Sequence, residues 1–435
     1  MADKVSILKR DGSKIDYNTY GNARINAVSA DLIQIWATLN EQIILKNGVD
    51  IWIAPGVEIS ISSNLPTITD NGFACICNIY GSGIIINTNS TPLATNNAAC
   101  NFSHQNSQVC MECDYIENAG SEILFSCISS NAATFHLKCN KVISKNNCAI
   151  ILSNANSDIN FNITKVETGL ANDTSTGITA IISRGNGFIK IDEILCRNLG
   201  HCLSHRASEV LARIRKLTTV TRRTGDSGAT AHISQGTQTQ KLILYFDEIN
   251  GLAEGMGISS NDSIQVTQGT GIFIGRKAFS THSNALQITG TNTKGYIICN
   301  ELISSNKNGL GLNSFTNQIT LIINYIEGNN ADAGAVFVAG AANFILKNAK
   351  CKNLASGASS RTFWIIPEGT LEPNITFNNV KIVSNGHVIF FDEIQYGNLD
   401  IENFGLFTNK DLDTNIILEI GLEGNFQYVS SPELT

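Results

Sequence analysis

The chain of 435 residues carries a formal net charge of −7, with 15% charged and 7% aromatic residues. This acidic balance argues against nucleic acid as a partner, because a nucleic-acid backbone usually requires a basic protein face. Its 36 glycines and only 6 prolines, with abundant Asn, Ile and Ser, favour short strands joined by tight turns over coiled coils and long helical arrays.

Residues 1–28 are polar and offer few core positions, which predicts an N-terminal leader that is either an attachment segment or disordered. Met1 leads into neither an apolar signal core nor a cleavage site, and no stretch approaches about 18 uninterrupted apolar residues. We therefore expect synthesis in the cytoplasm and no membrane insertion.

Residues 29–48 are predicted to form a capping α-helix. Ser29 suits the N-cap position, and apolar residues follow at the spacing of one helix face, namely Leu32, Trp36, Leu39 and Ile43. A helix of this kind would cover the open end of a stack of coils.

Residues 49–407 are predicted to form the repeat region, because between residues 113 and 380 the sequence repeats a two-point motif, apolar-x-x-apolar, at intervals of roughly 23 to 32 residues. The copies are Cys113/Ile116, Cys139/Val142, Ile163/Val166, Ile191/Ile194, Ile214/Leu217, Phe246/Ile249, Gly275/Ala278, Cys299/Leu302, Ile323/Ile326, Leu346/Ala349 and Phe377/Val380. A second short apolar strand and another polar turn follow most copies. We predict an all-β fold, a single-stranded right-handed parallel β-helix or solenoid, in which inward side chains of successive coils stack into one core.

The residue before the second apolar point forms a charge ladder. In successive copies it is Lys141, Lys165, Glu193, Lys216, Glu248, Lys277 and Glu301. From Lys165 onward the sign alternates, so neighbouring coils would place opposite charges side by side, each pair contributing about 0.2–1 kcal/mol.

Twelve cysteines are spread through apolar strand positions and are predicted to be reduced core residues. Cys110 and Cys113 form a CxxC, but no second CxxC or His pair completes a metal site, so no metal is expected. Beyond Phe407 the repeat fades, and residues 408–435 are predicted to be a C-terminal cap or tail.

Two turns in the opening coils are similar to turns of a known protein superfamily. A strand from Val49 breaks at Pro55-Gly56, and a second strand ends in Gly81-Ser82-Gly83. Following a capping helix, this order resembles the pectate-lyase-like superfamily of right-handed β-helices, which includes phage tailspikes. The resemblance covers residues from about 29 to 400 and specifies fold much better than activity.

Members of that superfamily with enzymatic activity use acidic clusters on the outer face of adjacent coils. Adjacent carboxylates are therefore candidate catalytic residues. The pairs are Asp192-Glu193, Asp247-Glu248 and Asp392-Glu393. Neighbours on one strand would point to opposite sides, and two of the pairs include ladder residues, which favours a structural role. His201, His205 and His232 are interpreted as surface or turn residues, and the absence of a phosphate loop predicts no cofactor.

The strongest local anomaly is basic. An enlarged loop with Arg222, Arg223 and Asp226 follows an outward strand with Arg213 and Arg215, in an otherwise acidic chain. These five residues are the candidate ligand site, able to receive an acidic sugar or an acidic protein partner. The alternative is a solvated face balanced by acidic residues in neighbouring coils.

The resemblance and the missing export signal together predict a structural or adhesive β-helix of a phage virion, either tailspike-like or a head appendage. Residues 1–28 would contact other virion proteins, the rod would contact host-surface glycans, and the superfamily suggests a homotrimer. Two alternatives stay open: a polysaccharide lyase or glycoside hydrolase acting along the coils, and a cellular adhesin.

Overall fold

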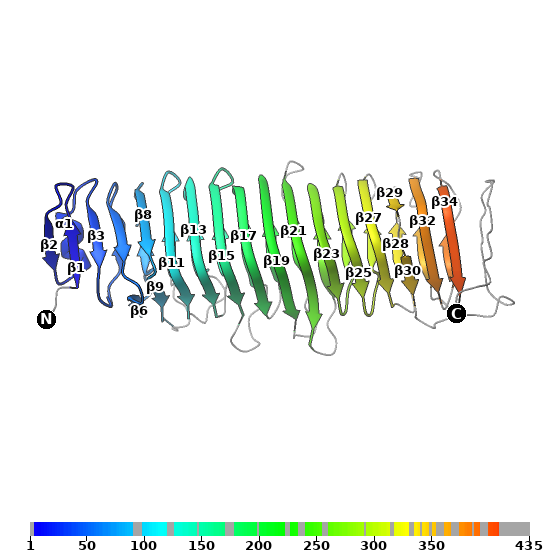
Figure 1. The fold of residues 1–435 in the computed structure, drawn as a ribbon, viewed down its shortest axis with the longest axis horizontal. Helices are drawn as coiled ribbons and strands as arrows, with labels where there is room; N and C mark the ends of the chain where they lie inside the picture. The colour runs from blue at the N-terminus through cyan, green and yellow to red at the C-terminus, as the bar shows by residue number, and fades with distance from the viewer. Residues whose placement is uncertain are drawn as a thin grey trace. The chain divides into compact units, whose positions relative to one another are not determined.

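The computed structural model describes residues 4–89, 98–119, 126–145, 148–169, 178–197, 200–221, 227–233, 240–254, 260–290, 293–313, 317–329, 335–339, 342–347, 350–353, 361–366, 374–384, 387–391 and 399–408. The chain divides into two compact units, residues 1–215 and 216–435. In each unit the described strands form a parallel β-solenoid, which confirms the predicted fold class. Figure 1 shows the strands following one another in chain order within each unit.

The first unit begins with an antiparallel hairpin rather than a leader. Strand β1 (Val5–Leu8) pairs on one side with β2 (Lys14–Tyr17) and on the other with β3 (Leu32–Ile35). The only helix among the described residues, α1 (Tyr20–Asn26), follows β2 and begins at the N-cap Thr19, whose Oγ1 accepts a 3.3 Å hydrogen bond from the amide of Asn22.

The prediction of a polar leader over residues 1–28 is therefore wrong for its described part. Val5, Ile7, Tyr20, Ala23 and Ala27 are all buried. The Tyr20 hydroxyl donates to the carbonyl of Ile44 (2.8 Å), which fixes α1 to the first coil. The sequence did not predict this core, because its apolar residues are spaced irregularly through a polar segment.

The prediction of a capping helix over residues 29–48 is also wrong, because that segment forms β3 and the short strand β4 (Ile43–Ile44). Ile33 and Ile35 alternate inward, as in a half-buried strand, while Trp36 faces outward. The apolar spacing fitted a helix, but β3 gains ladder hydrogen bonds from β1 on one edge and from β5 (Asp50–Ile53) on the other. The N-terminal end of the unit is instead occupied by β1, β2 and α1 (Figure 1).

From β3 onward the strands of the first unit pair in parallel, in two sheets. The first sheet continues through β5, β6 (Glu58–Ile61), β8 (Ile76–Gly81), β9 (Ile84–Asn87), β11 (Gln108–Asn118), β13 (Thr134–Ser144), β15 (Asp158–Thr168) and β17 (Asn186–Arg197). The second contains β4, β7 (Ile68–Thr69), β10 (Cys100–Phe102), β12 (Ile128–Ser130), β14 (Ile150–Leu152), β16 (Ile178–Ser183) and β18 (Gly200–His205). Each later coil thus contributes one long and one short strand.

The two-point motif is the corner of a coil. Cys113 pairs with Cys139, which pairs in turn with Ile163, so the predicted register is confirmed. Asp114, the residue after the first apolar point, has no partner in the ladder, and the strand bends there. The bend lets two adjacent residues face outward between two inward ones, which explains the spacing of apolar-x-x-apolar.

Close contact between coils accounts for the glycine turn in the opening coils. Gly81 has φ +115°, and a Cβ at this position would lie 2.0 Å from the carbonyl oxygen of Ile53 in the preceding coil. A Cβ at Gly83 would lie 2.3 Å from the Ile53 side chain. Only glycine lets the two coils approach this closely.

The second unit repeats the same arrangement. One sheet contains β21 (Lys241–Ala253), β23 (Thr270–Ser280), β25 (Lys294–Ser304), β27 (Asn317–Gly328), β29 (Ala342–Lys347), β30 (Lys350–Asn353), β32 (Asn374–Ser384) and β34 (Leu399–Thr408). The other contains β20 (Ser227–Ile233), β22 (Ser260–Val266), β24 (Leu286–Thr289), β26 (Leu310–Asn313), β28 (Val336–Ala339), β31 (Arg361–Ile366) and β33 (His387–Phe391).

One predicted step of the motif in the second unit is out of register, namely the step from Ile323/Ile326 to Leu346/Ala349, whereas the next step, from Leu346 to Phe377, is in register. Ile326 pairs with Cys351, two residues beyond the expected Ala349. Inward and outward positions alternate with a period of two, so a shift by two residues leaves the apolar pattern intact and the sequence does not distinguish the registers. The predicted tail at residues 408–435 lies outside the described residues except for Thr408, which ends β34.

The core contains stacked aromatic and thiol side chains. Phe102, Phe135 and Phe161 follow one another with ring centroids 5.4 and 5.6 Å apart. All twelve cysteines are free, and ten are buried as predicted for core residues, whereas Cys110 and Cys148 are partly exposed. Burial raises the pKa of the Cys299 thiol to about 12, which keeps it protonated at neutral pH.

A buried carboxylate, Asp70, ties one turn of the first unit to the next coil. It accepts hydrogen bonds from the amides of Ser103 (3.0 Å) and His104 (2.9 Å) and from the Ser107 hydroxyl (2.9 Å). The Ser103 hydroxyl (3.1 Å) and the amide of Gly72 (3.1 Å) also donate to it. One aspartate thus satisfies five donors that the turn would otherwise bury or leave to water.

Candidate functional site

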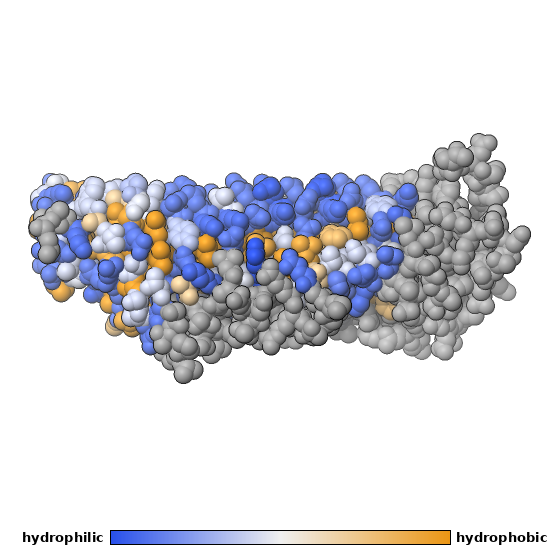
Figure 2. Space-filling model, turned by 90° about the horizontal axis from the view of Figure 1, so that it is seen from below, coloured by the Kyte–Doolittle hydropathy of each residue, from blue (hydrophilic) through white to orange (hydrophobic). Residues whose placement is uncertain are grey.

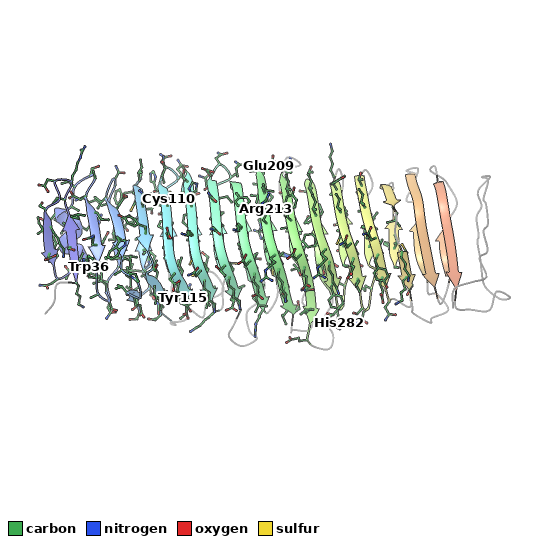
Figure 3. All side chains as sticks on the ribbon, in the orientation of Figure 1. Trp36, Cys110, Tyr115, Glu209, Arg213 and His282 are labelled. Carbon is green, nitrogen blue, oxygen red and sulfur yellow. The ribbon has the colours of Figure 1, made fainter. Side chains whose placement is uncertain are left out.

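The structure describes two of the five residues of the predicted basic site. Arg213 and Arg215 are exposed on the outer face of β19 (Glu209–Thr221), alternating with buried Ala212 and Ile214, as predicted. Figure 3 labels Arg213 on this strand, below Glu209. Arg222, Arg223 and Asp226 lie outside the described residues, so a ligand site formed by all five remains a prediction.

The adjacent carboxylates lie at coil corners. Asp192 and Glu193 both face outward, as do Asp247 and Glu248, so the expectation that such neighbours point to opposite sides is wrong. The reason is the strand bend, which interrupts the alternation. Asp392 and Glu393 lie outside the described residues.

The ionisation of Glu248 suits an ion pair better than proton donation. Burial alone would raise the pKa of this carboxyl, but the hydrogen bond from Arg276 and its charge hold the pKa below the ordinary value. A general acid in glycoside hydrolysis instead needs a raised pKa, so that it carries a proton at neutral pH.

One carboxyl with a raised pKa lies in the second unit, but it is inaccessible. Burial raises the pKa of Asp262 to about 6, against hydrogen bonds from Ser283 and from the amide of Asn284. The Asp262 residue is only 2% exposed. It is a structural carboxyl in β22 that binds the turn at Ser283 and Asn284, out of reach of a polymer on the surface.

The charge ladder is confirmed within each unit. In the first, Lys141 pairs with Lys165 and Lys165 with Glu193; in the second, Glu248 pairs with Lys277 and Lys277 with Glu301. The Nζ and carboxylate oxygen are 3.8 Å apart both in Lys165–Glu193 and in Lys277–Glu301. The sequence therefore predicted the neighbours in this outward column correctly.

Sequence reasoning missed individual carboxylates that lie two residues after ladder positions. Glu167 contacts both Lys141 (3.0 Å) and Lys165 (2.6 Å). Glu117 contacts Lys145 (3.0 Å) and accepts a 2.5 Å hydrogen bond from Tyr115, which is labelled in Figure 3. The signal in the sequence was a Glu two residues after a ladder position. Most copies of the two-point motif have an inward or neutral residue there.

The three histidines singled out in the sequence do not form a centre. His205 is buried in β18, and its Nε2 lies 3.0 Å from the carbonyl of Ser208, so the prediction of a surface residue is wrong. Burial lowers the pKa of His205 and favours the neutral ring. His201 and His232 belong to different units. Among the described residues no cluster of His, Cys, Asp or Glu suits a metal ion.

Three side chains of the kinds found in catalytic triads lie side by side on β11, β13 and β15, and the sequence did not predict this row. Cys110 Sγ lies 3.8 Å from His136 Nδ1, and His136 Nε2 lies 3.3 Å from Asp158 Oδ2. This is the order of nucleophile, base and orienting carboxylate. However, burial and the charges of Asp50 and Asp158 raise the pKa of Cys110, and the neighbouring strand amides are engaged in the parallel ladder rather than free to bind an oxyanion.

The outer face of the opening coils also carries an aromatic shelf, defined as Trp36, Trp52 and Tyr80. The rings of Trp36 and Trp52 meet edge to face with centroids 4.7 Å apart, and Trp52 pairs with Tyr80 on the next coil. On the face that Figure 2 draws, hydrophobic residues lie among hydrophilic ones toward the N-terminal end of the chain. The signal in the sequence was an aromatic residue at outward positions of Ile51-Trp52-Ile53 and Ile79-Tyr80-Gly81.

Comparisons with protein-family models, with curated proteins and with solved structures each returned no match. No helix in the described parts of the chain has the length and apolar character needed to cross a membrane. The fold therefore defines the class, a parallel β-solenoid, and function must be argued from the surface.

Proposed function

We propose that the chain is a structural or adhesive β-solenoid of a phage virion, tailspike-like or a head appendage, that contacts glycans or other virion proteins. The observation that carries the proposal is the pairing of outward ionisable side chains with one another between coils. Examples in the first unit are Lys138–Glu112 at 2.6 Å and Lys141–Glu167 at 3.0 Å. Such pairs hold the outer face in one charge pattern instead of leaving carboxylates available for proton transfer.

Attachment to other virion proteins is assigned to the N-terminal end, now as a folded surface rather than a loose segment. Ile25 and Val28, three residues apart, are 72% and 60% exposed there and offer apolar surface to a partner. Burial of both in a protein interface would remove apolar surface from water. The proposed assembly is a homotrimer, as in the spikes that the opening coils resemble.

The test is association with particles. We expect the chain in purified virions, and we expect the double variant Ile25→Asp/Val28→Asp to fold normally but to be lost from them, measured by quantitative immunoblotting of gradient-purified particles. Phe73→Asp is the matched control, because Phe73 is 70% exposed and lies in the turn between β7 and β8, outside α1. A chain that is missing from wild-type particles, or that cleaves a polysaccharide in purified form, would overturn the proposal.

A further inference from the structure

We infer that the aromatic shelf, together with the adjacent pair Asp50 and Asn78, is a binding subsite for the pyranose rings of a neutral glycan. This inference names the ligand of the proposed adhesive function and rests on it. In the first unit Trp52 lies on β5, Tyr80 lies on β8 and Trp36 directly follows β3, where three successive coils present their outer faces.

The aromatic side chains occupy positions that the strand alternation leaves to solvent. Trp36 is 45% exposed and Tyr80 is 36% exposed, while their neighbours Ile35, Ile51 and Ile79 point into the core. Neighbouring rings that stay partly exposed form a contiguous patch, and such patches mark binding surfaces more often than scattered apolar residues do. A sugar ring presents an apolar C–H face that can cover such a ring and return its surface to an apolar environment.

The shelf is held in place before any ligand arrives. The Trp36 Nε1 donates a 2.8 Å hydrogen bond to the Ser6 hydroxyl of β1, and the edge-to-face contact with Trp52 fixes the mutual tilt of the two rings. Lys14 Nζ lies 5.5 Å from the centroid of Trp36. Because these contacts already restrict Trp36, less conformational entropy is lost when a ring stacks on the shelf.

Polar groups border the shelf where sugar hydroxyls would lie. The Asp50 carboxylate accepts a hydrogen bond from the backbone amide of Asn78 (2.9 Å). It also accepts hydrogen bonds from the side-chain Nδ2 of Asn78 (3.1 and 3.2 Å), and together these contacts orient both side chains on the outer face. A carboxylate has about four acceptor sites, so Asp50 keeps capacity for a hydroxyl donor. Asp50 stands two residues before Trp52 on β5, and Asn78 stands two residues before Tyr80 on β8, which places this pair on the same outward side as the shelf.

The spacing of the coils fits an extended glycan. Successive coils stack at about 4.8 Å, which is close to the length of one sugar ring in an extended chain. A glycan laid across β3, β5 and β8 would therefore meet a similar outward position at each residue. Further along the same face it would meet the polar pairs Glu112–Lys138 and His136–Asp158.

Charge selects a neutral glycan over other extended polymers. Single-stranded nucleic acids also stack on aromatic side chains, but their binding sites are lined with cations. Here the Asp50 carboxylate lies on the outward side of β5 beside Trp52, the Lys14 ammonium lies near Trp36, and the net charge of the chain is −7, so the shelf is not lined with cations alone. The Asp50 carboxylate would repel acidic sugars, so this subsite differs from the basic one predicted around Arg213.

The test is affinity electrophoresis of the full chain in gels containing neutral glucans, galactans or mannans, with polygalacturonate as the acidic comparison and tryptophan fluorescence as a second readout. We expect retardation by at least one neutral polymer and not by polygalacturonate, with a change in tryptophan emission. Trp52→Ala should weaken binding by about tenfold or more. Phe73→Ala, an exposed apolar residue outside the shelf, should bind as the wild type does.

Two further measurements distinguish failure of the glycan subsite from misfolding of a variant and from failure of the proposed virion role. Tyr80→Ser, a change at a more exposed ring, should also weaken binding, so a Trp52→Ala chain that fails to fold by circular dichroism does not decide the result. Trp52→Ala particles should still carry the chain, because attachment is assigned to another surface. Retardation by no neutral polymer, or unchanged affinity in a folded Tyr80→Ser chain, would overturn the subsite and leave the virion role standing.

Discussion

Asp70→Ala is expected to lower the free energy of unfolding of the first unit by about 3–5 kcal/mol. The substitution removes a buried carboxylate and leaves its donors, including the amides of Ser103 and His104 and the Ser107 hydroxyl, without their acceptor. Each orphaned buried donor costs about 1–3 kcal/mol, although water entering the turn recovers part of this. Urea denaturation followed by circular dichroism measures the change.

The matched control for Asp70→Ala is Asp158→Ala. Asp158 also accepts a hydrogen bond, from His136, but its side chain is 67% exposed. We expect a loss below about 0.5 kcal/mol there, as for most exposed pairs. Equal losses for the two variants would contradict the assigned role of the Asp70 turn.

Deletion of residues 1–28 is expected to prevent the first unit from folding normally, with a loss of about 5 kcal/mol or more. The deletion removes β1 and α1, and with them buried Val5, Ile7 and Tyr20. It also exposes the edge of β3, whose amides and carbonyls now pair with β1, and an open edge of this kind favours aggregation. Size-exclusion chromatography and thermal unfolding of the truncated chain provide the measurement.

A single exposed substitution separates loss of the N-terminal structure from a minor change within it. Ile25→Ser alters α1 at a side chain that is 72% exposed, so it should leave the unfolding midpoint nearly unchanged. A truncated chain that stays monodisperse and unfolds at the wild-type midpoint would show that the hairpin and helix add nothing to the fold.

The repeat was predictable because its signal is redundant. The pairs Cys113/Ile116 and Cys139/Val142 recur with a polar turn and a second strand in nearly every copy, and the core requires inward residues to stack in register. The same redundancy located the ladder neighbours Lys277 and Glu301. The pairing of Ile326 with Cys351 was not predicted, because strand alternation is the same in two registers that differ by two residues.

The N-terminal end and the candidate surface were less predictable, for different physical reasons. The apolar spacing around Trp36 fits both a helix face and a strand, and only the availability of β1 and β5 as partners decides between them. Trp52 and Tyr80 become a shelf only because their coils are adjacent, which a local pattern does not reveal. The row from Cys110 to Asp158 depends likewise on register across three coils.

Binding without cleavage is the central expectation for an adhesive solenoid. The most direct measurement is to incubate the purified chain with host-surface polysaccharide and to follow both by size-exclusion chromatography with light scattering. The account predicts that the polymer co-elutes with the chain and keeps its full mass. A fall in polymer mass, accompanied by new reducing ends or unsaturated products, would contradict it and identify the chain as a hydrolase or lyase.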